Sequence, residues 1–273
     1  MDLEPYFQRI GYVGSRTPNL ATLHALTRAH TTTIPFENLD VLLGRRISLE
    51  PDALMQKLVH DRRGGYCFEQ NGLFLAVLQE MGFDARPLSA RVRIDRPRDY
   101  TPPRTHIFVR VELEGESFLT DVGVGAHSLT GAIRLNTETP QETPHETRRI
   151  VKEDGRWFHQ MLMGGEWKDI CEFTLEEMPM IDRELGNWFT SAHPVSHFRN
   201  RLIVARASDN GERHTLLNDE LKVRDREGKA TVTKLGSRAE LLSALRSRFG
   251  LEFSPETRFV EGATVSPTPW PND

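Results

Sequence analysis

The chain has 273 residues, of which 38% are hydrophobic and 27% are charged, and its net charge of −4 corresponds to a pI near 6.2. This composition is typical of a globular protein, and its acidic balance disfavours a general nucleic-acid binder. The first residues lack a signal-peptide pattern, and no apolar run reaches the ~20 residues of a membrane span. Because only two cysteines are present, Cys67 and Cys171, we expect a cytoplasmic protein with reduced thiols and no membrane partner.

Hydrophobic residues at helical spacing predict that residues 1–83 are mainly helical. One helix is predicted from Thr17, where a proline follows in the first turn, and a second from Ser48. A third begins at Cys67 and ends at Gly82, because glycine readily adopts the backbone conformation that closes a helix.

After this third helix the apolar residues alternate, which is typical of strands. We expect strands at 89–94, 105–113, 116–123, 147–152, 156–163, 167–173, 201–207, 212–217, 219–224 and 229–234. Residues 174–200 are expected to be helical or irregular. A last helix begins at Ser237, which has capping-box spacing with Glu240, and ends at Gly250. The central part of the chain is therefore predicted to be β-rich.

Cys67 is the candidate nucleophile. It follows Gly64 and Gly65, which allow a sharp bend and the close approach of a substrate. A cysteine at a helix N-terminus lies at the positive end of the helix dipole, which favours the thiolate. The alternative is a buried cysteine that acts as a small apolar residue. We interpret Cys171 in that structural way, since it lies in a strand-like segment.

A β-hairpin with a two-residue turn at 114–115 is predicted to bring a base and an acid together. In the register set by this turn, His106 pairs with Gly123, and Asp121 is its diagonal neighbour on the same face. Diagonal Cα atoms lie ~7–8 Å apart, which permits a hydrogen bond between the two side chains. The opposite face pairs mainly apolar residues: Ile107 with Val122, Val109 with Thr120, and Val111 with Phe118.

These three residues predict a catalytic triad in the order Cys67, His106, Asp121. The cysteine supplies the nucleophile, the histidine accepts its proton, and the aspartate orients the imidazole and stabilises its charged form. Taken singly, a strand histidine or an aspartate near a strand end is usually inert. Their convergence on one face favours the catalytic interpretation.

Several segments in chain order resemble the arylamine N-acetyltransferase family, over nearly the whole length of the chain. They are Ile34-Pro35-Phe36-Glu37-Asn38-Leu39-Asp40, Arg63-Gly64-Gly65-Tyr66-Cys67, Pro103-Arg104-Thr105-His106, Asp121-Val122-Gly123, and the segment from Asn187-Trp188-Phe189-Thr190-Ser191 through His197-Phe198. The resemblance implies an α+β, cysteine-proteinase-like fold. It would consist of an N-terminal helical bundle (1–83), a central β-barrel (84–190) and a C-terminal α/β lid (191–273).

The resemblance also implies an activity. Cys67 would take an acetyl group from acetyl-CoA and pass it to an aromatic amine or hydrazine in a ping-pong reaction. Acetyl-CoA is then a co-substrate, and no permanently bound cofactor, metal or nucleic acid is expected. The stretch Gly123-Val124-Gly125 is interpreted as lining the acyl-donor pocket. Val124 stands where the family often has an aromatic residue, which puts the acceptor preference in question; the oligomeric state stays open.

Two further interpretations concern the surroundings of Cys67. The backbone N–H of Phe68 is the candidate oxyanion donor, because it lies next to the nucleophile. The resemblance favours a structural ion pair between Glu37 and Arg63 that ties the early loop to the turn before Cys67. From the residues alone, exposed surface charges are the default, and an exposed pair would contribute only ~0–1 kcal/mol.

The arginine-rich stretch at 86–104 is interpreted as a solvated strand face and loop, with the hypothesis that Arg96 and Arg98 attract CoA phosphates. His193 and His197 have a spacing found in metal sites, but Pro194 disrupts a helical pair and no cysteine partner is near, so we assign no metal.

A Cys-His-Asp triad also serves other reactions. One alternative is a cysteine hydrolase or a transglutaminase-like enzyme, although the cysteine context typical of papain is absent. Another is a carrier-dependent amide synthase, to which the family resemblance extends. Incubation with acetyl-CoA, with and without an aromatic amine, separates the first alternative from acetyl transfer.

Overall fold

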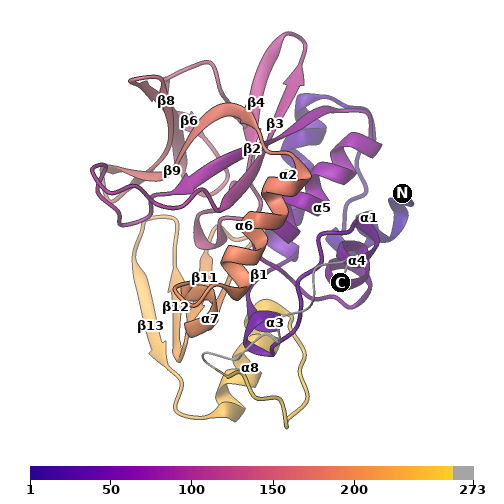
Figure 1. Ribbon diagram of the computed structural model, residues 1–273, viewed down its shortest axis with the longest axis vertical. Helices are drawn as coiled ribbons and strands as arrows, with labels where there is room; N and C mark the ends of the chain where they lie inside the picture. Colours follow the sequence, from indigo (N-terminus) through magenta and orange to yellow (C-terminus); the bar gives the residue numbers. More distant parts are fainter. Residues whose placement is uncertain (261–273) are drawn as a thin grey trace.

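The computed structural model describes residues 1–260, and residues 261–273, which the predicted lid range includes, lie outside the described residues. It has an α+β fold in which N-terminal helices pack beside a strongly curved eight-stranded sheet, with a second sheet of five strands below (Figure 1). The architecture of helical bundle, central barrel and α/β lid expected from the resemblance is confirmed.

The first part is helical, with one short strand. Its elements are α1 (Glu4–Ile10), α2 (Leu20–Thr33), β1 (Phe36–Glu37), α3 (Leu39–Leu42), α4 (Pro51–Leu54), the π-helical η1 (Met55–His60) and α5 (Cys67–Glu80). Helix α2 begins later than the predicted Thr17, because Asn19 provides the cap and its Oδ1 accepts the Thr22 N–H at 2.9 Å. The helix predicted from Ser48 begins at Pro51 instead, since proline suits the first helical turn.

The central part is the eight-stranded sheet. Its strands are β2 (Asp84–Val92), β3 (His106–Leu113), β4 (Glu116–Thr120), β5 (Ile133–Arg134), β6 (Gln141–Glu142), β7 (Thr147–Glu153), β8 (Arg156–Met163) and β9 (Glu166–Glu177). Their order is β5-β4-β3-β2-β9-β8-β7-β6, and β5 contacts β7, so the sheet curls into a nearly closed barrel. The short 3₁₀ segment η2 (Gly125–His127) follows β4.

The last elements follow the eight-stranded sheet, and four of their strands belong to the second sheet. They are α6 (Met180–Ala192), α7 (His197–Asn200), β10 (Ile203–Ala207), β11 (Arg213–Leu217), β12 (Glu220–Arg224), β13 (Ala230–Lys234) and α8 (Arg238–Phe249). Strand β1 pairs with β10, so the N-terminal part contributes an edge strand to this sheet. Ser237 caps α8 by accepting the Glu240 N–H, and Gly250 closes it with a φ of 70°, as predicted.

The hairpin of β3 and β4 has the predicted register. Val109 pairs with Thr120 and Leu113 pairs with Glu116, and both turn residues, Glu114 and Gly115, have positive φ. However, β4 ends at Thr120, so the ladder stops before the pairs predicted for residues 121–123.

Helix α5 packs on β2 and β3. Its apolar side chains, including Phe74 and Leu78, are fully buried against Val109 and Val111 of the sheet. This packing directs the N-terminal end of α5 toward the start of β3 and the end of β4.

Candidate active site

Cys67 is the first residue of α5, as predicted. The two glycines before it are required by packing: a Cβ on Gly64 would lie 1.9 Å from the Pro35 carbonyl oxygen, and one on Gly65 would lie 2.6 Å from a carboxylate oxygen of Glu69. That carboxylate accepts the Tyr66 N–H at 3.0 Å. The turn before Cys67 is therefore held by close packing and by a helix cap.

Cys67 is buried, with 5% of the residue exposed. Its Sγ lies 3.6 Å from the carbonyl oxygen of Thr105, the residue directly before His106. Cys67 also hydrogen-bonds to the His106 side chain, an interaction that favours the charged imidazole. The start of α5 and the start of β3 therefore meet at the sulfur.

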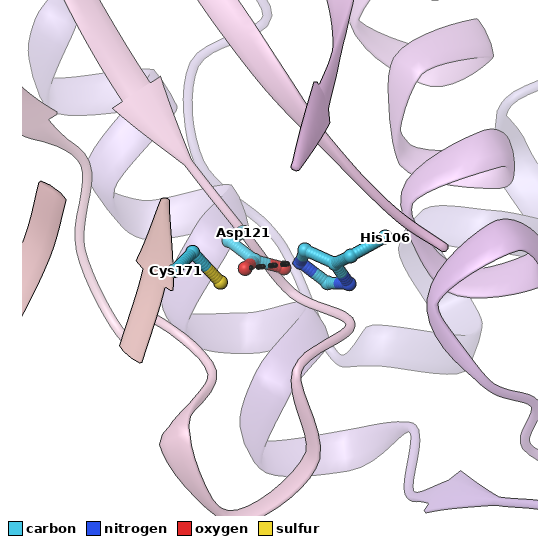
Figure 2. A group of neighbouring side chains, drawn as sticks. All are labelled: His106, Asp121 and Cys171. Atoms are coloured by element: carbon cyan, nitrogen blue, oxygen red, sulfur yellow. Dashed lines mark hydrogen bonds and ion pairs between the residues drawn. The ribbon is translucent and has the colours of Figure 1, made fainter. Parts of the chain in front are cut away.

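His106 and Asp121 form the hydrogen bond that the hairpin predicted. His106 Nε2 donates to Asp121 Oδ2 at 2.7 Å, and both side chains are buried (Figure 2). Burial alone would lower the pKa of His106, but the charge and hydrogen bond of Asp121, with the contact to Cys67, raise it to about 10. For Asp121, burial raises the pKa, yet His106, Asn71 and the Gly123 N–H together hold it below its usual value. The favoured state is a buried imidazolium–carboxylate pair.

The other oxygen of Asp121 is held by two donors. The Gly123 N–H donates to Oδ1 at 3.0 Å, and Asn71 Nδ2 donates to it at 2.9 Å. Glycine is needed at position 123, because a Cβ there would lie 2.8 Å from the Cys67 Cα. The loop after β4 thus packs directly on the nucleophile.

Cys171, on β9, lies beside the pair (Figure 2). One potential ligand atom each from His106, Asp121 and Cys171 lies within 4.8 Å of the others, the only metal-like grouping among residues 1–260. Burial raises the pKa of the Cys171 thiol, as do the nearby Asp121 charge and Cys67. The imidazole and the carboxylate are hydrogen-bonded to each other, so the geometry fits a His–Asp pair next to a neutral thiol.

Glu37 and Arg63 form the predicted ion pair, with Arg63 Nη2 donating to Glu37 Oε1 at 2.6 Å. The same carboxylate oxygen accepts the Gly64 N–H at 3.3 Å, so the pair holds the backbone next to Cys67. Three residues not predicted join this cluster: Lys57 contacts Asp40 and Glu69, at 2.8 Å and 2.6 Å.

The loop 123–125 and Phe68 border the site. The Val124 N–H donates to Ser128 Oγ at 3.0 Å, so this amide already has an acceptor within the protein. Gly125 has a φ of 68° and faces the Phe36 ring. The N–H of Phe68 belongs to the first turn of α5, where helix amides have no acceptor within the helix.

The arginines at 86–104 mostly have partners within the protein. Arg93 is buried against Glu172, and Arg98 donates to Asp169 at 2.7 Å. Arg96 lies over the Tyr100 ring at 5.3 Å. Arg93 is buried, so the solvated-face interpretation holds only for the exposed members of the stretch, such as Arg96.

His193 and His197 are packed on aromatic rings. The His193 ring stacks on Phe189 at 4.6 Å, and the His197 ring lies 4.4 Å from that of Phe198. Neither belongs to the metal-like grouping found among residues 1–260.

Asn71 is the main site residue that the sequence did not reveal. It lies on α5 one turn after Cys67, is fully buried, and contacts Asp121. The available signal was its i+4 spacing from Cys67 in a helix otherwise rich in apolar residues.

The arrangement can carry out nucleophilic acyl chemistry. A thiol at a helix N-terminus hydrogen-bonds to an imidazole, which in turn hydrogen-bonds to a buried carboxylate. This is the sequence of groups that produces an activated cysteine nucleophile and a proton acceptor.

Comparison with known proteins places this geometry in one family. A family model described as N-acetyltransferase matches residues 19–258. A relative from Escherichia coli (strain K12), named arylamine N-acetyltransferase, is 41% identical over 91% of this chain and 88% of its own length. Another of that name from Mycolicibacterium smegmatis is 42% identical over 92% of each chain.

Solved structures agree. A structure of the M. smegmatis arylamine N-acetyltransferase is 42% identical, covers 92% of this chain and 93% of its own, and has a TM-score of 0.88. The Mycobacterium marinum arylamine N-acetyltransferase, solved in complex with CoA, is 39% identical and has a TM-score of 0.87. The match covers 91% of this chain and 92% of the M. marinum chain. Within residues 1–260, none of the helices has the length and apolar character needed to cross a bilayer.

Proposed function

This chain belongs to the arylamine N-acetyltransferase family, and from that premise we propose that it transfers an acetyl group from acetyl-CoA to the nitrogen of aromatic amines through an acetyl-Cys67 intermediate. It is an acyltransferase, and acetyl-CoA is its co-substrate. The observation that carries the proposed mechanism is the buried chain of contacts from Cys67 through His106 to Asp121. Hydrazines are included as acceptors because they offer the same nucleophilic nitrogen.

In the first half-reaction, His106 accepts the Cys67 proton and the thiolate attacks the carbonyl carbon of the acetyl-CoA thioester. The tetrahedral oxyanion is placed near the Phe68 N–H, which is our candidate oxyanion donor. When the intermediate collapses, the carbon–sulfur bond to CoA breaks, and the imidazolium returns a proton to the CoA thiolate. Asp121 keeps the imidazole oriented and stabilises its charged form throughout.

In the second half-reaction, the amine nitrogen attacks the acetyl carbon of Cys67. His106 accepts the proton that the nitrogen loses, and Cys67 leaves as the thiolate. The loop 123–125 is proposed to line the pocket that both substrates use in turn, with Val124 as a wall residue. Val124 is 7% exposed and packs in the barrel core, and as a wall residue it would present an aliphatic surface to that pocket.

A reducing compartment suits this chemistry. Both cysteines are free and buried, and the proposed mechanism needs Cys67 as a thiolate. We therefore infer a cytoplasmic enzyme. We also infer the division into parts 1–83, 84–190 and 191–273, with the nucleophile on the first and its base and acid on the second.

The mechanism is tested by replacing Cys67. We expect Cys67→Ala to abolish acetyl transfer, and incubation with radiolabelled acetyl-CoA to leave no label on that variant. Cys171→Ala is the matched control, since this other buried cysteine should leave both labelling and turnover intact. Retained turnover in Cys67→Ala would exclude the proposal.

Kinetics separate the alternatives. A ping-pong transferase gives parallel lines in double-reciprocal plots when acetyl-CoA and amine are varied. A hydrolase would instead release CoA at a rate that does not depend on the amine concentration. An amide synthase would prefer an acyl chain on a carrier protein over acetyl-CoA. Parallel lines with aniline or hydrazine acceptors therefore support N-acetyl transfer.

A further inference from the structure

The ladder between β3 and β4 is interrupted at the place where the site begins. Antiparallel pairs alternate between hydrogen-bonded and non-hydrogen-bonded, and the pair beside a two-residue turn is hydrogen-bonded. Counting from Leu113 and Glu116, the next hydrogen-bonded pair beyond Val109 and Thr120 would join residues 107 and 122. The ladder ends before that pair.

The side chain of Asn71 takes the place of this missing rung. Asn71 Nδ2 donates to the Ile107 carbonyl oxygen at 2.6 Å, and the Val122 N–H donates to Asn71 Oδ1 at 2.9 Å. These two backbone groups would have bonded to each other in a continuous ladder. The carboxamide therefore lies between the two strands, like an inserted peptide group.

The same carboxamide also holds the acid of the site. Asn71 Nδ2 donates to Asp121 Oδ1 at 2.9 Å as well. Two N–H donors and one oxygen acceptor thus all have partners, in a side chain that is fully buried. Since Asn71 lies on α5, one turn after Cys67, a single rigid helix connects the nucleophile to both strands.

We propose that Asn71 is a positioning residue, whose carboxamide separates β3 from β4 at the triad and fixes Asp121 toward His106. This inference rests on the proposed function, because it assigns a role within that same triad. We expect the longer glutamine side chain not to fit between the two strands. An alanine would leave the Ile107 carbonyl oxygen and the Val122 N–H without hydrogen-bond partners. An aspartate has the same shape but can donate only while it is protonated.

The consequence is electrostatic as well as geometric. Without the Asn71 donor, the Asp121 carboxylate loses a hydrogen bond to its charged form, and its pKa rises. A carboxylate that Asn71 no longer holds can also turn away from His106 and then stabilises the imidazolium less, so the Cys67 thiolate forms at higher pH. Since hydrogen bonds to charged groups are among the stronger ones in proteins, we expect the loss of this one to lower the rate about 10- to 150-fold.

The experiment compares Asn71→Ala and Asn71→Asp with the wild type and with Gln70→Ala. Gln70 is the matched control because it is a buried neighbour on α5 whose side chain contacts His30 and the Pro35 carbonyl. For each protein, the rate of Cys67 alkylation by iodoacetamide is measured against pH, together with kcat and the KM for acetyl-CoA.

We expect Asn71→Ala to lower kcat at least ~10-fold, with a KM within ~2-fold of wild type, and to move the alkylation midpoint to higher pH. Asn71→Asp should lose more activity at pH 8 than at pH 6, because it donates only when protonated. Gln70→Ala should lose thermal stability but keep the wild-type alkylation midpoint. If Asn71→Ala does not fold, the isosteric Asn71→Asp still gives the pH-dependent readout.

Wild-type kcat and a wild-type midpoint in the folded Asn71 variants would overturn the positioning role and leave the proposed function intact. Failure of the wild type itself to form acetyl-Cys67 would overturn the proposed function instead. A fall in kcat shared equally by Gln70→Ala would show that the effect is only structural, and it too would overturn the inference.

Discussion

Two buried ion-pair clusters differ in charge and in the parts of the chain that they join. The nucleophile cluster consists of Glu37, Asp40, Lys57, Arg63 and Glu69 and has three acids for two bases. The barrel–lid cluster consists of Glu146, Arg148, Arg213 and Arg224 and has one acid for three bases.

The nucleophile cluster acts on the backbone around Cys67. Its Glu37 accepts the Gly64 N–H, and its Glu69 accepts the Tyr66 N–H, so two carboxylates hold the residues that precede the cysteine. All of its members come from residues 37–69. A change in the charges of this cluster should therefore change the backbone conformation next to Cys67.

The barrel–lid cluster joins elements that are far apart in the chain. Glu146, just before β7, accepts both Nε and Nη2 of Arg213 on β11, at 2.9 Å and 2.7 Å. Arg148 on β7 and Arg224 on β12 contact the same carboxylate at 3.0 Å each. One carboxylate thus holds the barrel and the lid sheet together.

The difference indicates that the two clusters have different roles. The first should affect both stability and chemistry, whereas the second should affect stability alone. This distinction is tested by substitutions in each cluster, for which the unfolding free energy and the turnover are both measured.

The largest combined effect is expected from Arg63→Met. Loss of this cation leaves Glu37 without its buried partner and leaves Asp40 with Lys57 as its remaining buried one, which costs about 3–5 kcal/mol of unfolding free energy. Because Glu37 also holds Gly64, turnover per folded molecule should fall as well. Urea denaturation and kcat measured on the folded fraction check both parts; unchanged turnover would mean that this cluster is purely structural.

Glu146→Gln should destabilise the protein by about 3–5 kcal/mol, because three guanidinium groups lose their common carboxylate. In contrast to Arg63→Met, turnover per folded molecule should stay near wild type. Urea denaturation paired with an acetyl-transfer assay tests this. A large loss of kcat in the folded variant would contradict the assignment of this cluster to assembly alone.

The barrel–lid cluster should also make the fold acid-sensitive. Burial raises the pKa of Glu146, but Arg213, Arg148 and Arg224 outweigh it and hold that pKa far below its usual value. The folded state then binds fewer protons than the unfolded state, so this stabilisation is present above the unfolded pKa of about 4.3 and is lost as pH falls below it. Thermal melts from pH 3 to 7 should show a shallower acid decline for Glu146→Gln than for wild type.

The smallest effect is expected from an exposed pair. Lys234 and Asp219 lie 3.5 Å apart, with side chains that are 75% and 52% exposed. Lys234→Ala should change the unfolding free energy by less than about 0.5 kcal/mol, since water screens such pairs. A Tm shift comparable to that of Glu146→Gln would show that burial does not decide the strength of these pairs.

Local patterns predicted much of the fold and of the candidate site. The alternation of β3 and the Glu114-Gly115 turn were sufficient for the hairpin register, because side-chain period and turn length together permit one pairing. The same register predicted the hydrogen bond between His106 and Asp121. Helix starts were less well predicted at Thr17 and Ser48, since several neighbouring residues can cap a helix.

Cys67 and the pair formed by Glu37 and Arg63 were also evident from the chain, through the glycine turn, the helix pattern and the family resemblance. The sequence by itself therefore determined the strand pairing of the hairpin and the identity of the candidate triad. These features depend on residues close in sequence or on one short turn.

Only the tertiary structure decided the partners of Asn71 and Glu146. Asn71 bonds to backbone groups of two strands that are 36 and 51 residues away in the sequence. Glu146 accepts hydrogen bonds from arginines that are up to 78 residues away. A buried amide or carboxylate leaves no periodic signal in the sequence, because its hydrogen-bond partners are chosen by how the chain packs. The physical reason is that hydrogen-bond satisfaction in a core is a property of the assembled molecule.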